Sequence, residues 1–381
     1  MATSNEILRD QVIAHQIQLL RFGKGLRNRI NRELNRVEPE LRRRLRVRLE
    51  RIAALGWDPG PAQTRRMTKT LELITEIQKG TWEDINKLVR DELVGLAQAE
   101  SVWISGVLSG SLPVIWEPTL PTPRELRAIV FARPFNNRLL RQWMREFEAG
   151  DRRRMMDEIR QGLLFGETPS QIGRRIWGTQ ALQGTDGVRE ISRRGAQTLA
   201  QTATASITNA VRQETYKRNR RIIRREQYVA TLDSRTTPQC RALDGGIYPV
   251  GEGPIPPVHI NCRSVRVPVV DGRPLGSRPA NRATRDQLRG LRGPARRRAV
   301  ERLVGRVPAE TTYQEFLERS TAAFQDEVLG PTRGRLFRRG GLDVQAFVDN
   351  CGNQYTLREL YEINPSAFQR AGLSAPSLEG P

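Results

Sequence analysis

The stretch from 228 to 270 constrains the fold most, because two strand-like runs enclose a dense set of turn residues. Its first run, 228–232, is rich in β-forming residues, and its last run, 265–270, is apolar at alternate positions before an apolar end. Between them lie Asp-Gly-Gly at 244–246 and a proline-rich segment at 254–257. This pattern predicts a strand, a turn, a loop and a second strand.

Cys240, His259 and Cys262 are the chemically distinctive residues of this stretch. His259 and Cys262 share one tight turn, and Cys240 would join them if the two strands pair. Two thiolates and an imidazole suit zinc. No fourth ligand stands at an obvious position, and Asp233 or Asp244 could supply an oxygen. The alternatives are two ordinary buried thiols beside a loop histidine, or a Cys240–Cys262 disulfide, which a reducing cytosol disfavours.

The same residues resemble the signature of the Mu F-like minor head proteins, a family of phage head morphogenesis proteins. The matching sequence is Asp233-x-Arg235-Thr236-x-x-x-Cys240-Arg241-x-Leu243-Asp244-Gly245, followed by Pro256-Pro257-x-His259-x-x-Cys262-Arg263. Thr237 and Ser264 stand where the family usually has further cysteines, and these departures weaken the metal interpretation. With weaker matches on both sides, the resemblance extends over about residues 120–360.

The resemblance implies a non-enzymatic minor structural protein of a tailed-phage virion. Such a protein would be made in the host cytoplasm and lie in the head interior near the portal, in several copies. It would act in head assembly and in genome packaging or delivery. The implied partners are the portal protein, the major capsid protein and packaged double-stranded DNA, the last through backbone contacts.

The positive charge of the chain independently predicts a polyanionic partner. The net charge is +21, and 58 of the 63 basic residues are arginines. The excess is concentrated in 21–51, 212–225 and 281–306, which we interpret as basic helices. An arginine-favouring codon bias and ordinary solvated helix faces are the alternative explanations. The candidate polyanion contacts are Arg42, Arg43, Arg44, Arg220, Arg221, Arg296, Arg297 and Arg298.

Hydrophobic periodicity predicts a mainly α fold with a small α+β module. We expect an extended helical N-terminal region over 1–120 and a head-morphogenesis-like module over 121–271. Residues 272–381 would hold a linker at 272–280, a basic helix pair at 281–306 and short C-terminal helices. The longest, central helix is expected at about 188–223. The uncharged, largely apolar run 101–116 is too short and too rich in Ser, Gly and Pro to span a membrane. The polar N-terminus indicates no signal peptide.

Two further functions compete with a structural role. An ejected DNA-binding accessory protein would have the same basic segments. A metal-dependent nuclease would use Asp233 and Asp244 as a carboxylate pair, although the Asp-Gly turn at 244–245 explains the second aspartate equally well. His259 beside a cysteine also imitates a nucleophile pair. No phosphate-binding glycine loop or nucleophile elbow accompanies these residues, so we expect no catalytic residues.

Overall fold

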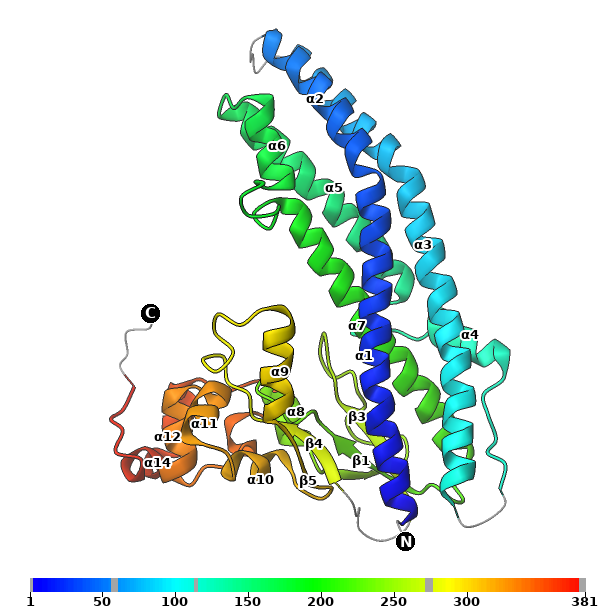
Figure 1. The fold of residues 1–381 in the computed structure, drawn as a ribbon, viewed down its shortest axis with the longest axis vertical. Helices are drawn as coiled ribbons and strands as arrows, with labels where there is room; N and C mark the ends of the chain where they lie inside the picture. The colour runs from blue at the N-terminus through cyan, green and yellow to red at the C-terminus, as the bar shows by residue number, and fades with distance from the viewer. Residues whose placement is uncertain (1–2, 56–60, 113–115, 271–276, 377–381) are drawn as a thin grey trace.

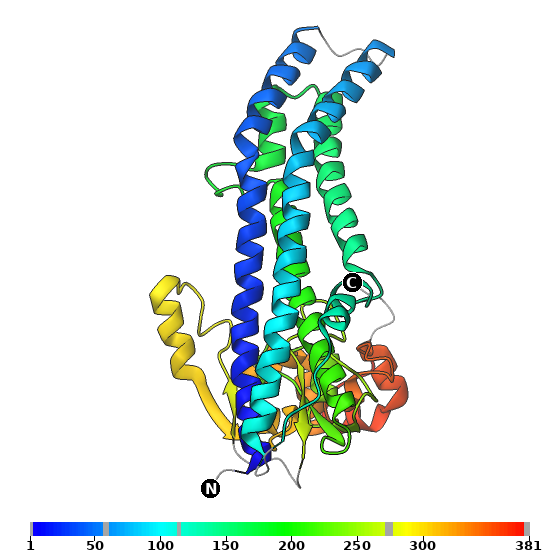
Figure 2. The ribbon, with the colours of Figure 1, turned by 90° about the vertical axis from the view of Figure 1, so that its right-hand side faces the viewer.

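The computed structural model describes residues 3–55, 61–112, 116–270 and 277–376. Figure 1 and Figure 2 show a long bundle of helices with a compact group of short strands and helices against its lower end. The predicted class, mainly α with a small α+β module, is confirmed. Among the described residues, every helix is too short or too polar to cross a membrane.

The bundle is formed by the first seven helices. They are α1 (Ser4–Arg36), α2 (Glu38–Ala54), α3 (Pro61–Ser111), α4 (Pro123–Phe131), α5 (Leu140–Leu164), α6 (Pro169–Trp177) and α7 (Val188–Arg218). The compact group contains β1 (Arg225–Val229), α8 (Pro238–Leu243), β2 (Ile247–Pro249), β3 (Val265–Val269), β4 (Ser277–Asn281), α9 (Gly293–Leu303), β5 (Val304–Pro308), α10 (Tyr313–Glu318), α11 (Ala322–Leu329), α12 (Pro331–Gly340), the 3-10 helix η1 (Gln345–Phe347), α13 (Leu357–Ile363) and α14 (Pro365–Arg370).

The N-terminal helices begin and end where local chemistry predicts. Thr3 and Glu6 form a capping box at the start of α1. Pro39 lies in the first turn of α2, where its missing N–H costs nothing, so a new helix begins directly after α1. The apolar stripe of α1 is buried against α3 and α7. This packing crosses the predicted boundary at residue 120.

Small residues let α1 and α7 approach closely. A Cβ added at Gly23 of α1 would lie 3.5 Å from the Cα of Gln201 on α7. Ala200 and Ala203, on the same part of α7, are fully buried. The backbones of α1 and α7 therefore approach closely at this level of the bundle.

Two small antiparallel sheets lie beside the bundle. β1 is central in the first, between β2 and β3, and Tyr228 is opposite Arg266. The condition for Cys240 to join His259 and Cys262, pairing of the two flanking strands, is met, although β1 ends at Val229 and overlaps the expected run 228–232 only at its first two residues. β2 was not predicted, because its three residues give no alternating pattern. β4 and β5 form the second sheet, which a bridge between Leu232 and Ala280 joins to the first.

The C-terminal helices pack on the module through a shared core. Leu232 and Ala280 belong to the same buried cluster as Phe316, Phe324 and other residues of α10 to α14. The Tyr313 hydroxyl donates to the Asp233 carbonyl oxygen at 2.7 Å. The described part of the chain after residue 276 is therefore built onto the central module.

Three sequence predictions of secondary structure are wrong. Residues 281–306 contain one helix instead of two: α9 begins at Gly293, after a series of turns that ends at Gly290, and both glycines adopt positive φ. Residues 277–280, predicted as linker, are part of β4, whereas 272–276 lie outside the described residues. α7 ends at Arg218, and its 31 residues are fewer than the 51 of α3, which continues through Gly80.

The distribution of positive charge also differs from the prediction. The segment 212–225 runs from α7 through a turn into β1, and Arg212 is buried against Glu100. The basic stretch of α2 has more acidic partners on its own helix than its sequence suggested. Glu38 pairs with Arg42 there, and Glu40 pairs with both Arg43 and Arg44. Charge counted along the sequence therefore overstates the charge available to a partner.

Candidate metal centre

The fold brings Cys240, His259 and Cys262 together. Cys240 is in the first turn of α8, whose N-cap is Thr237. His259 and Cys262 lie in the loop between β2 and β3, in a turn closed by a bond from the Cys262 N–H to the His259 carbonyl. The Asn261 N–H donates to the Thr202 hydroxyl of α7 at 3.1 Å, which fixes this loop on the bundle.

The three side chains are close enough to hold one ion. Their ligand atoms lie within 4.8 Å of one another. Cys240 Sγ is 3.7 Å from Cys262 Sγ and 3.1 Å from His259 Nε2. For comparison, two sulfurs bound tetrahedrally to zinc at about 2.3 Å lie about 3.8 Å apart. Both cysteines are buried and neither forms a disulfide, so the structure does not support the Cys240–Cys262 bridge.

The histidine is oriented for ligation by its other nitrogen. Nδ1 lies 2.7 Å from the Ile260 carbonyl oxygen, which accepts its proton. In the neutral ring, this leaves the lone pair of Nε2 directed at Cys240 Sγ and at the Thr237 hydroxyl, 2.9 Å away. A backbone carbonyl in this position is a common second partner of a metal-binding histidine.

The electrostatics favour one negative sulfur in the cluster. The hydrogen bond between the two thiols lowers the pKa of Cys262 to about 6 and raises the pKa of Cys240 to about 12. Burial lowers the pKa of His259, but its contact with Cys240 outweighs burial and the net direction is upward. A deprotonated sulfur is the form that binds a metal.

Neither predicted oxygen ligand joins the cluster. Arg263 binds both carboxylate oxygens of Asp233 at 2.7 Å. Asp244 accepts from the Ala230 N–H and is held at both oxygens by Arg278, at 2.9 and 3.0 Å. Two separate arginines thus neutralise the aspartates expected to act as a nuclease pair. Among the described residues, the cluster has three His, Cys or acidic members.

A small cavity of about 120 Å³ lies against Cys240 and His259. Arg235 and Arg263 also line it. Tyr228, which was not predicted to matter here, places its hydroxyl 3.3 Å from Cys240 Sγ. Its position at the centre of the first sheet is visible only once the register of β1 is known.

The predicted polyanion contacts are spread over three regions. Arg42, Arg43 and Arg44 lie on α2 with their carboxylate partners. Arg220 and Arg221 line a cavity of about 380 Å³ at the end of α7, and one Arg220 nitrogen donates to the Val250 carbonyl. Arg296, Arg297 and Arg298 are exposed on α9.

We predict that Asp233→Asn lowers the free energy of unfolding at pH 7 by about 3 kcal/mol, because Arg263 loses its ionised partner while remaining largely buried. Burial raises the pKa of Asp233, but Arg263 outweighs burial and the net direction is downward. The ionised carboxylate therefore stabilises the fold above its unfolded pKa of about 4, and this contribution is lost as pH falls through the lower folded value. Urea unfolding should show a smaller difference in the free energy of unfolding between wild type and variant at pH 3 than at pH 7.

Asp286→Asn is the control for this prediction, because Asp286 and its partner Arg289 are 83% and 84% exposed. An exposed pair contributes little to stability. Equal destabilisation of both variants at pH 7 would contradict the role given to the Asp233–Arg263 pair.

Comparison with known proteins identifies the segment that contains this cluster. Residues 153–267 match the family model described as Phage Mu protein F like protein. This range is shorter than the 120–360 expected from the motifs, and it contains Cys240, His259 and Cys262. No curated protein and no solved structure matches the chain. The resemblance noted in the sequence is confirmed over this range: residues 153–267 match the family of the Phage Mu protein F like proteins, which supports a phage head morphogenesis protein.

Proposed function

We propose that this protein is a minor structural component of a tailed-phage head, bound near the portal inside the capsid. The family match over 153–267 carries the proposal, since that family is one of phage head morphogenesis proteins. Its role there is head assembly and genome packaging or delivery, without catalysis. The long bundle supports a scaffolding role, because α1, α3, α5 and α7 share one continuous buried core. The short helix α4 adds Leu126 and Val130 to this core.

The basic helix α9 is the part of the chain best placed to contact DNA. None of its residues is buried, and Figure 2 shows it projecting from the body of the molecule. Arg296, Arg297 and Arg298 are exposed on it, and one Arg296 nitrogen donates to the Leu288 carbonyl. In contrast, Arg42, Arg43 and Arg44 each have a carboxylate partner within a helical turn. Arginines of this kind bind phosphates without reading bases.

We predict that removing positive charge from α9 lowers the affinity for DNA and makes that affinity less dependent on salt concentration. Changing Arg296, Arg297 and Arg298 together to Gln removes three phosphate contacts, each worth about 0.9 in the slope of log affinity against log salt. Fluorescence anisotropy with a 30-bp duplex over a series of NaCl concentrations measures the slope. The matched control changes Arg42, Arg43 and Arg44 to Gln, and it should alter the slope less. If the control has the larger effect, α9 is not the contact.

The location near the portal is tested on the virion. A helix of 51 residues, such as α3, forms a rod of about 75 Å. A cryo-electron microscopy map of filled virions should show this rod beside the portal, inside the capsid. Density on the outer surface only, or none in the head, would refute the proposal. The alternative of an ejected DNA-binding protein predicts that the rod disappears from virions that have released their genome.

We further propose that Cys240, His259 and Cys262 hold a structural zinc ion. The close sulfur atoms and the Nδ1–carbonyl bond of His259 fit such an ion. When bound, zinc would fix α8 to the loop between β2 and β3.

Metal analysis of the purified protein should find about one zinc per chain, because structural sites bind tightly. Cys240→Ser and Cys262→Ser should each lose most of the metal and lower the unfolding temperature. Cys351→Ser is the matched control, since Cys351 is an exposed thiol outside the cluster, and it should change neither quantity. Wild-type zinc below about one ion in ten chains would exclude a structural site.

A further inference from the structure

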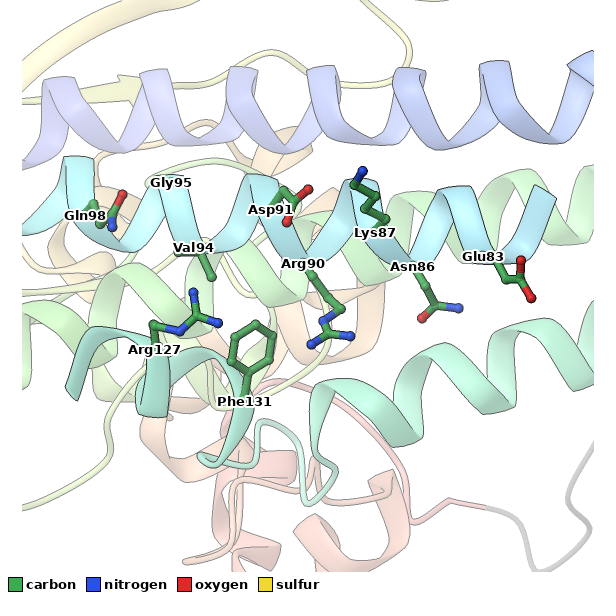
Figure 3. A pocket seen from close by; sticks show the side chains of 10 residues that line it. All are labelled: Glu83, Asn86, Lys87, Arg90, Asp91, Val94, Gly95, Gln98, Arg127 and Phe131. Atoms are coloured by element: carbon green, nitrogen blue, oxygen red, sulfur yellow. The ribbon is translucent and has the colours of Figure 1, made fainter. Parts of the chain in front are cut away.

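A second feature of the bundle has the form of a binding site. It is a cleft of about 490 Å³ between α3 and α4, and it shares no lining residue with the Cys240 cluster. This volume is within the range of about 300–1,000 Å³ that is typical of ligand sites. Figure 3 shows the residues that line it. They are Glu83, Asn86, Lys87, Arg90, Asp91, Val94, Gly95, Gln98, Arg127 and Phe131.

Two arginines from different helices pack against one aromatic ring in this cleft. The guanidinium carbon of Arg90, on α3, lies 5.1 Å from the centre of the Phe131 ring. That of Arg127, on α4, lies 5.6 Å from it. Figure 3 shows both guanidinium groups beside the half-buried ring. Cation–π contacts of this kind restrict a flexible side chain without using its N–H donors.

The donors of these two arginines are therefore left for a ligand. Within the described ranges, neither Arg90 nor Arg127 has an ion-pair partner. The acidic residues Asp84 and Glu92 of α3 are committed to α1, where they pair with Arg36 and Arg29. Each guanidinium has a planar fork of N–H donors that matches the oxygens of a carboxylate or a phosphate, and the two forks lie around the same ring.

The rest of the lining favours a carboxylate of a protein over the backbone of DNA. Glu83 and Asp91 are also at the cleft and would repel a continuous polyanion. Val94, Gly95 and the Phe131 ring provide apolar surface, which a phosphate backbone does not need. Arginine and aromatic residues in a pocket of this kind are typical of the strongest contacts in protein interfaces.

We propose that Arg90 and Arg127 bind an aspartate or glutamate side chain of a partner protein, whose adjacent apolar side chain packs on Phe131. This inference rests on the proposed function for the identity of the partner, which would be a protein of the phage head. The chemistry of the site does not depend on that identity. DNA would bind instead through α9, so the two ligands use separate surfaces.

The test uses the full-length protein and a fluorescein-labelled peptide of alternating Glu and Phe, with a Gln-for-Glu twin. We expect wild type to bind the Glu peptide more tightly than its twin. Arg90→Gln and Arg127→Gln should each weaken this binding at least about tenfold, the loss expected for a charge-assisted hydrogen bond. Arg90→Lys should also weaken it, because an ammonium keeps the charge but loses the fork.

Arg339→Gln is the matched control, because it removes an exposed arginine from α12, in the C-terminal part of the chain. It should leave peptide binding unchanged. Circular dichroism confirms that each variant is folded. The proposal would be overturned if Arg90→Gln and Arg127→Gln both left peptide binding unchanged. It would also be overturned if these variants lost duplex DNA binding instead of peptide binding. Absence of the protein from the head would refute the proposed function and leave the peptide result standing.

Discussion

Buried pairs of arginine and carboxylate connect the parts of this protein to one another. In the described residues, four such pairs have both side chains no more than 2% exposed. They are Asp151–Arg189, Glu100–Arg212, Glu226–Arg266 and Asp244–Arg278. They join α5 to α7, α3 to α7, β1 to β3, and β4 to the turn after α8. Removing one partner of such a pair leaves an uncompensated charge in the interior, which costs about 3–5 kcal/mol.

The pair between Glu100 and Arg212 extends to a third helix. His15 of α1 lies 2.7 Å from the second Glu100 oxygen and stacks on Trp103 with ring centres 3.7 Å apart. Burial raises the pKa of Glu100, but Arg212 and His15 outweigh burial and the net direction is downward. The carboxylate therefore stays ionised, and α1, α3 and α7 are held in register at one level of the bundle. Apolar packing alone would allow helices to slide along one another more easily.

The sequence was sufficient for elements defined by neighbouring residues. Helix periodicity predicted the helical region that contains α1 to α3, and the two long runs of the central stretch predicted β1 and β3. The cluster of Cys240, His259 and Cys262 followed from one assumption, that these runs pair. Short or irregular elements were missed, because three residues of β2 and the strands on either side of α9 have no periodic pattern.

Charge was the property that sequence reasoning treated least well. Counting arginines assigned Arg212 to a basic surface, although it is buried against a residue 112 positions away. The same limitation concealed Arg90 and Arg127, because their common ring is brought to them by the packing of α4 on α3. Whether an arginine stabilises the interior, pairs on its own helix or remains free for a partner depends on contacts distant in sequence. The total of +21 contains no such information.

The matched family segment is incomplete without residues beyond it. Asp244 follows α8 and accepts the Ala230 N–H, but its charge is balanced by Arg278, which lies after the matched range ends at residue 267. Arg278 also donates to the Thr311 carbonyl, and Arg241 of α8 donates to the Val328 carbonyl of α11. The helix that holds Cys240 is thus fixed on one side by β1 and on the other by the C-terminal part. Because that part neutralises Asp244, it contributes directly to the position of the candidate metal ligands.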